Sequence, residues 1–89
     1  DPKAIIVMRA LRDAGLRIPE DVSVLGFDNI EISSMLEPPL TTVSQPFYEM
    51  GALAVKKLIS QIEAKESGEK YYPTTNLMDT ELIIRKSTK

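Results

Sequence analysis

The sequence of 89 residues contains no cysteine and no histidine. The chain can therefore form no disulfide, no zinc site of the Cys/His type and no Ser-His or Cys-His catalytic pair of its own. No apolar run approaches the roughly 20 residues that a membrane-spanning helix needs, and no signal-peptide pattern opens the chain. We expect no membrane association, and the lack of cysteine is compatible with a cytoplasmic location.

An excess of basic charge is also missing, because 11 Lys and Arg residues stand against 13 Asp and Glu residues, for a net charge of −2. A DNA-binding module normally presents a basic face, so we expect no contact with phosphates from this chain itself. Its 43% of hydrophobic residues are enough for a core, although a domain of this size is only marginally stable alone.

The first predicted element is a helix over residues 2–14. Asp1 is a suitable N-cap whose side chain can accept from the first free amides, and Pro2 fits the first helical position. Gly15 supplies a left-handed stop. The apolar stripe of this helix consists of Ala4, Val7, Met8, Leu11 and Ala14. Because a helix begins the chain, we interpret residues 1–89 as a fragment in which a βα unit is truncated.

Alternating strand and helix patterns follow this helix. The apolar run from Val22 to Phe27 is typical of a strand buried on both faces of a parallel sheet. The later elements are a short helix over 31–36, a strand over 40–44, a helix from Pro46 to about Ala64 and a β-rich stretch over 74–85. This order predicts the α/β class, with a partial three-layer, Rossmann-like parallel sheet.

Asp28 is the candidate ligand-binding residue, because it comes just past the carboxyl end of the first predicted strand. Ligands of open α/β sheets bind in the crevice beyond the strand ends. Two structural alternatives stay open. Asp28 and Asn29 can simply end the strand and cap the short helix, and Gln45 can either contact the ligand or close a turn.

The segment VSVLGFDNIEISSMLEPPLTTVSQP, residues 22–46, closely resembles the end of the effector-binding core in the LacI/GalR family of bacterial transcription regulators. The shared pattern is Gly-Phe/Tyr-Asp-Asp/Asn, then Pro-Pro-Leu-Thr-Thr-Val/Ile and Gln-Pro. The resemblance implies the C-terminal subdomain portion of a periplasmic-binding-protein-like fold. Residues 1–89 would form a single fragment of the effector-binding and dimerisation domain, without the DNA-binding headpiece.

The same resemblance implies roles for individual residues. The Asp28 carboxylate would hydrogen-bond hydroxyl groups of the effector, while Phe27, Phe47 and Met50 would line or border the pocket. Phe47 and Met50 can equally be core residues of a helix. Asp1 matches the Asp of an Asn-Asp pair in the family, and its alternative role is that of an N-cap.

Family dimers pair largely through their core subdomains, which implies a dimer surface on the first helix and the short helix. An independent sign is that Ile5 and Ile6 extend the apolar surface of the first helix beyond its stripe. In the alternative interpretation both pack inside their own subunit. The candidate interface residues are Lys3, Ile5, Ile6, Arg9, Ile32, Met35 and Leu36, with Ala10 beside them.

The sequence thus predicts the ligand-sensing and dimerisation portion of a sugar-responsive DNA-binding transcription regulator, a repressor. Its expected partners are a sugar or sugar phosphate, a second copy of itself, and operator DNA through the headpiece; a phosphoprotein corepressor is an alternative effector. Another possibility is a sugar-binding protein of a transport system. We expect no enzyme, cofactor or metal site, because the clustered acids Asp28, Glu31 and Glu37 lack a base, a metal set or a phosphate loop.

Overall fold

The computed structural model describes all residues from 1 to 89. Its elements follow the predicted order: α1 (Pro2–Asp13), β1 (Leu25–Phe27), η1 (Glu31–Met35, a 3₁₀ helix), β2 (Thr41–Ser44), α2 (Phe47–Ser67) and β3 (Glu81–Ile83). The chain divides into two compact units, which we call the sheet unit (Asp1–Gln45 with Thr80–Lys89) and the helix unit (Pro46–Asp79). The α/β class is confirmed.

The start and the end of α1 agree with the sequence. Pro2 occupies the first turn, and Gly15 adopts the left-handed φ of +79° while its N–H donates to the carbonyl oxygen of Arg12 at 2.9 Å. The predicted capping contact of Asp1 is wrong. Asp1 stands at the N-cap position, but its side chain makes no capping hydrogen bond, because other donors occupy both carboxylate oxygens.

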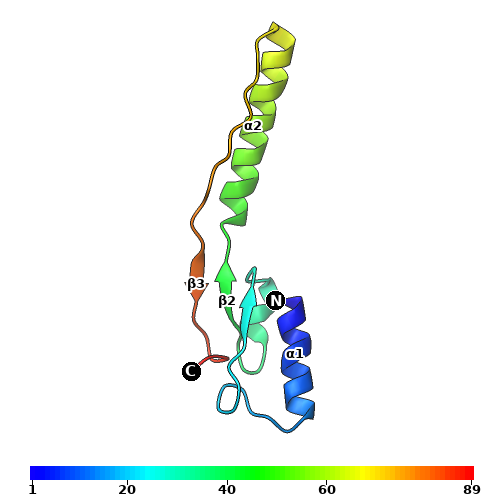
Figure 1. Cartoon of the computed structure of the whole chain (residues 1–89), viewed down its shortest axis with the longest axis vertical. Coiled ribbons are helices and arrows are strands. Elements are labelled where there is room, and N and C mark those ends of the chain that lie inside the picture. The colour runs from blue at the N-terminus through cyan, green and yellow to red at the C-terminus, as the bar shows by residue number, and fades with distance from the viewer. The chain divides into compact units, whose positions relative to one another are not determined.

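The sheet has the order β1-β2-β3 (Figure 1). β1 and β2 run parallel, with Leu25 opposite Thr41, as the sequence predicted. β2 and β3 run antiparallel, with Ser44 opposite Glu81. The expectation of a parallel sheet therefore fails for β3. The reason is that the chain re-enters the sheet opposite the last residue of β2, at the end where it left.

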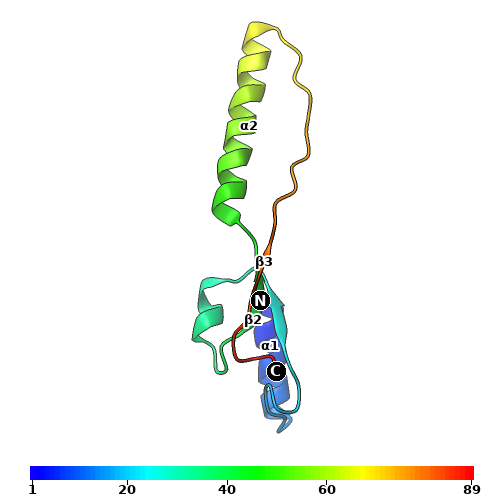
Figure 2. The same cartoon turned by 90° about the vertical axis from the view of Figure 1, so that its left-hand side faces the viewer.

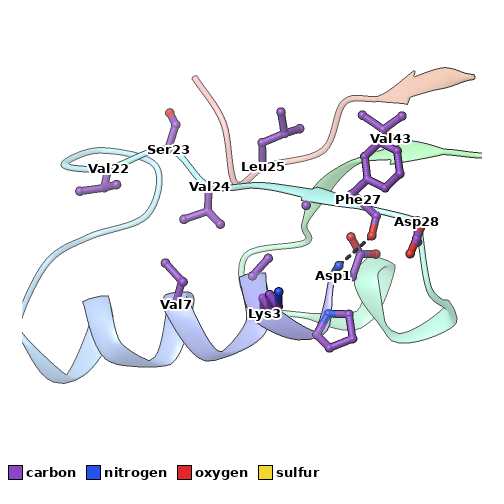
Figure 3. Close-up of a pocket in the computed structure, with 13 residues that line it drawn as sticks. Asp1, Lys3, Val7, Val22, Ser23, Val24, Leu25, Phe27, Asp28 and Val43 are labelled. Carbon is purple, nitrogen blue, oxygen red and sulfur yellow. Dashed lines mark hydrogen bonds between the residues drawn. The ribbon is translucent and has the colours of Figure 1, made fainter.

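The core of the sheet unit is small. Met8, Val24 and Leu40 are 5%, 7% and 0% exposed. The half-buried residues packed against them are Ala4, Leu11, Ile18 and Leu36. The predicted burial of β1 on both faces is wrong, because Leu25 is 57% and Phe27 51% exposed. Side chains alternate along a strand, so α1 covers the face with Val24 and leaves the face with Leu25 open (Figure 3).

The C-terminal stretch forms less strand than expected. Of the β-rich residues 74–85, only Glu81–Ile83 pairs in the sheet. The following residues 85–88, which we call the C-terminal segment, cross beside the starts of β1 and β2. The fully buried Ser87 donates its hydroxyl to the carbonyl oxygen of Val24 at 2.6 Å and accepts the amide of Thr41 at 2.8 Å.

In the helix unit, α2 ends three residues later than predicted. It continues past Ala64 to Ser67 and ends at Gly68, whose φ is +75°. None of its residues is buried, although it carries the expected apolar side chains. Val55, Leu58, Ile59 and Ile62 are 56%, 55%, 50% and 48% exposed.

Residues 69–79 run back beside α2 in the helix unit (Figures 1 and 2). The Nζ atom of Lys57 donates to the carbonyl oxygen of Thr74 at 3.0 Å and so joins the two segments. Neither helix of the chain combines the length and apolar character of a membrane span. No three of its His, Cys, Asp or Glu residues gather as a metal-binding group.

Candidate functional site

Asp28 lies directly after β1, at the carboxyl end of a strand that pairs parallel with its neighbour. It lines one end of a groove of about 810 Å³ between α1 and β1 (Figure 3). The rest of the groove wall is mostly apolar, with Val7, Val22 and Val24 among its residues. The polar chemistry therefore lies at the end of β1, where the sequence placed it, and not along the groove.

The turn that carries Asp28 is unusual because it contains no glycine. Asp28 and Asn29 have φ angles of +93° and +51°, a region that side-chain-bearing residues rarely enter and that Asp and Asn tolerate best. The Asp28 amide donates to the carbonyl oxygen of Val43 at 2.8 Å. Gln45 Nε2 donates to Asp28 Oδ1 at 2.6 Å, while Oδ2 accepts no hydrogen bond from the chain.

Asn29 connects this turn to β2 and to the C-terminal segment. Its amide N–H donates to Thr42 Oγ1 at 3.1 Å, and its Nδ2 donates to Ser44 Oγ at 3.4 Å. Its Oδ1 accepts from Arg85 Nη2 at 2.9 Å. Sequence reasoning missed Arg85. The available signal was a basic residue placed between the apolar run Leu82–Ile84 and the polar end of the chain.

The Asp1 carboxylate is a buried acceptor for three separate segments. Asp1 is 8% exposed, and its Oδ2 accepts the Ile30 amide at 2.8 Å and the Ser33 hydroxyl. Its Oδ1 accepts the Thr42 hydroxyl at 2.7 Å. The backbone nitrogen of Asp1 donates to the carbonyl oxygen of Phe27 at 2.7 Å (Figure 3). Asp1 thus fixes the loop after β1 against β2 and η1.

Gly26 makes this arrangement possible. A Cβ atom at position 26 would lie 2.3 Å from Asp1 Oδ1 and 2.8 Å from Leu40 Cδ2. Both distances are shorter than real Cβ atoms show, so a side chain here would displace the carboxylate. The glycine within β1 is therefore required by the close approach of Asp1, a constraint that no spacing in the sequence reveals.

The other predicted pocket residues lie in different units. Phe27 belongs to the sheet unit, where it stands beside Val43 on the open face of β1 (Figure 3). Phe47 and Met50 lie in the first turns of α2, in the helix unit, and are 54% and 40% exposed. Neither is a core residue of this chain, and their pocket role stays a prediction.

The candidate interface residues all lie in the sheet unit. Ile5, Arg9 and Leu36 line one groove of about 360 Å³ between α1 and the segment after η1. Leu36 also packs on the core. The exposed apolar members are Ile6, Ile32 and Met35, at 69%, 48% and 78%, while Lys3 is exposed and Ile5 is half-buried. Ile6 therefore does not pack inside this chain.

Asp28 offers a hydrogen-bond acceptor and the groove beside β1 offers apolar surface to a ligand. The periplasmic binding protein-like domain family matches residues 1–88. The chain is 42% identical to the HTH-type transcriptional repressor CytR of Escherichia coli (strain K12) and 42% identical to the ribose operon repressor of Halalkalibacterium halodurans. Both matches cover 100% of this chain, but only 25% and 26% of the repressors.

Among solved structures, the Lac repressor bound to ONPG in its repressed state superposes with a TM-score of 0.85 and 35% identity. This match covers 99% of the chain and 25% of that repressor. The chain thus spans about a quarter of the length of the curated relatives it matches. These relatives are transcriptional repressors, not enzymes. The chain belongs to the periplasmic binding protein-like domain family, in the form found in the effector-binding core of LacI-family repressors.

Proposed function

We propose that this chain is the ligand-sensing and dimerisation portion of a DNA-binding transcription regulator, a repressor, whose effector is a hydroxyl-rich small molecule such as a sugar or sugar phosphate. The observation that carries the proposal is the position of Asp28 past the carboxyl end of a parallel strand. Its carboxylate has an oxygen that no group of the chain uses. A carboxylate accepts hydroxyl donors in charge-assisted hydrogen bonds.

Ligand binding at Asp28 would affect Gln45, the residue at which the chain leaves the sheet unit. The chain leaves the sheet unit after Gln45 and returns to it at Thr80. Gln45 is the residue that donates to Asp28 Oδ1. An effector hydroxyl that replaces or shares this hydrogen bond would favour one arrangement of the connection over another. An effector can shift the population of two states only by such a difference in affinity, and operator affinity would follow the same shift.

The open surfaces support a larger core around this chain. The groove beside β1 and the exposed apolar side of α2 are surfaces that a regulator of the relatives' length would cover. Residues 1–89 would form the C-terminal portion of its effector-binding domain, and operator DNA would be bound by a headpiece outside this chain. The repressors among the relatives favour this function over that of a transport protein.

The test is calorimetric titration of the full-length regulator with D-ribose, cellobiose, their phosphorylated forms and adenosine. We expect one of these to bind, and Asp28→Asn to weaken that binding by about 10- to 100-fold, because hydrogen bonds to a charged group contribute about 1.5–3 kcal/mol. Asp13→Asn, an exposed acid at the end of α1, serves as the matched control and should leave the affinity unchanged. Equal affinities of wild type and Asp28→Asn would contradict the proposal.

Dimerisation would use the exposed apolar residues of α1 and η1 in an isologous contact. Met35→Glu places a charge at the most exposed of the apolar candidate positions, at 78%. We expect it to raise the dimer dissociation constant of the full-length regulator at least about tenfold in analytical ultracentrifugation, because an unpaired charge would be desolvated. Leu77→Glu, at a 95% exposed residue of the helix unit, is the control. A dimer that tolerates Met35→Glu would place the interface elsewhere.

A further inference from the structure

The turn at Asp28 and Asn29 needs external support. Asp28 and Asn29, two consecutive non-glycine residues, have positive φ angles of +93° and +51°. Such conformations persist only where the surrounding structure fixes them. The amides of Asp28 and Asn29 are held by β2, through Val43 and Thr42. The Asn29 side chain has a further partner that comes from the far end of the chain.

That partner is the guanidinium group of Arg85, the first residue of the C-terminal segment. Its Nη2 donates to Asn29 Oδ1 at 2.9 Å, and its Nη1 donates to the carbonyl oxygen of Leu40 at 2.8 Å. The backbone N–H of Arg85 donates to Thr41 Oγ1 at 2.9 Å. Arg85 thus connects the residues at the start of β2 with the turn that follows β1.

The charge of Arg85 is not used in an ion pair, since the ion pair of this structure joins Arg17 and Asp21. Arg85 is half-buried, and its guanidinium is directed at two neutral oxygens. A planar guanidinium presents its donors in a fixed fork, whereas an ammonium group is a compact point charge on a flexible stem. The fork therefore fixes the direction of the Asn29 amide, with Oδ1 toward Arg85 and Nδ2 toward Ser44.

We propose that Arg85 is a positioning residue for the effector site, which sets the carboxylate of Asp28 by holding the side chain of the adjacent Asn29. This inference rests on the proposed function. It assigns an effect on ligand affinity to a residue that acts through Asn29 and lies 56 positions after it in the sequence. A purely structural Arg85 would stabilise the whole sheet unit without any particular effect at the turn.

The experiment compares wild type with Arg85→Lys in the full-length regulator. Hydrogen exchange followed by mass spectrometry reports on the amides of residues 28–30 and, separately, on α1. We expect Arg85→Lys to speed exchange at residues 28–30 about tenfold and to leave α1 within about twofold, because the change is local. Arg17→Lys, which also keeps its charge, is the matched control and should change neither region.

The second readout is the dissociation constant for whichever of D-ribose, cellobiose, their phosphorylated forms or adenosine binds the wild type. Arg85→Lys should raise it about tenfold, the effect of losing one charge-assisted hydrogen bond. In the Asn29→Ala background the same change should have almost no further effect, because the route through Asn29 is already lost. An undiminished effect of Arg85→Lys in that background would overturn the proposal.

The outcomes separate this inference from the proposed function. If Asp28→Asn abolishes binding while Arg85→Lys changes neither the affinity nor the exchange at residues 28–30, only the positioning role fails. If Asp28→Asn leaves binding unchanged, or none of the free and phosphorylated compounds titrated above binds, the proposed function fails. The exchange rates then still decide whether Arg85 holds the turn. Equal acceleration in α1 and in the turn would show a general structural role and overturn the inference.

Discussion

The sheet unit and the helix unit differ in what stabilises them. In the sheet unit a small apolar core is combined with buried polar side chains, and no buried side-chain polar atom lacks a hydrogen-bond partner. These buried polar residues are Asp1, Ser33, Thr41, Thr42 and Ser87. In the helix unit, α2 has 21 residues and none is buried.

This difference shows where the chain is self-sufficient. Most of the stability of a protein helix comes from packing of its apolar face rather than from helix propensity. The sheet unit has a core and satisfies its buried polar side chains from within the chain, although Leu25 and Phe27 stay exposed. The apolar side chains of α2, Leu58 among them, have no such core. We therefore expect the helix unit to depend more on other polypeptide for its stability.

The largest expected effect comes from truncating one leucine in each unit. Leu40→Ala removes a 0% exposed side chain and should lower the free energy of unfolding by about 2–5 kcal/mol. Leu58→Ala, at a 55% exposed residue, should cost less than about 1 kcal/mol in the 89-residue chain. Urea denaturation measures both.

The same pair also tests the dependence of α2 on other polypeptide. In the full-length protein Leu58→Ala should approach the cost of Leu40→Ala, because the face of α2 becomes buried. A small cost of Leu58→Ala in both proteins would mean that α2 stays uncovered, and the proposed contrast between the units would fail.

A second comparison uses one glycine from each unit. Gly26→Ala should destabilise the full-length protein by about 1–3 kcal/mol, because the new Cβ overlaps Asp1 and the core. Gly51→Ala should stabilise the 89-residue chain by about 0.5–1 kcal/mol, since nothing lies within 4 Å of a Cβ at this position in α2. Thermal melting in matched buffers distinguishes the two signs. A neutral Gly26→Ala would show that the Asp1 carboxylate can move at little cost.

The smallest expected effect is the pH dependence of stability that comes from the Arg17–Asp21 ion pair in the turn after α1. The side-chain hydrogen bond from Arg17, with its backbone hydrogen bond and charge, lowers the pKa of Asp21 below the usual 3.8. Stability from this pair is therefore present above pH 3.8 and is lost as the pH falls through the lower folded pKa.

Both residues are close to solvent, so the loss should be small and should decrease with added salt. Urea midpoints measured from neutral to acid pH should show a slight advantage of wild type over Asp21→Asn that disappears in acid. Arg17→Gln should reduce the same pH dependence without removing it, because the backbone N–H of residue 17 still donates to Asp21. An advantage that persists in acid would mean that the ion pair is not its source.

Much of the sheet unit could be predicted from local sequence signals. Pro2 and Gly15 delimit α1, and the Gly-aromatic-Asp pattern places Asp28 at the end of β1. The same signals failed where burial depends on residues far apart in the chain. Leu25 and Phe27 look like core residues, but only α1 covers their strand. Nothing local distinguishes buried Thr42 or Ser87 from surface hydroxyls, because their partners are Asp1 and Val24.

The sequence predicted the position of Asp28 in the candidate site, but it did not predict the contacts of the surrounding turn. Asp28 follows from its place after a strand, and the family resemblance strengthens it. The contacts around its turn come from three separate parts of the sequence, since Gln45 donates to Asp28, Arg85 donates to Asn29, and Asp1 accepts from Ile30. The side chain of Asp1 was expected to accept hydrogen bonds from the first amides of α1. It accepts from Ile30 and Thr42 instead, and these donors come from distant parts of the sequence.

The hydrogen bonds of the C-terminal segment have a consequence for synthesis on the ribosome. Ser87 binds Val24 across 63 positions of sequence, and Arg85 reaches Leu40 across 45. α1 can form its own helical hydrogen bonds as soon as it emerges, but Met8 meets its core partners Val24 and Leu40 only later. The carbonyl oxygen of Val24, just before β1, must stay hydrated until residue 87 has left the ribosome. A premature stop codon at position 85 would release a nascent protein with all its predicted pocket residues and no completed site.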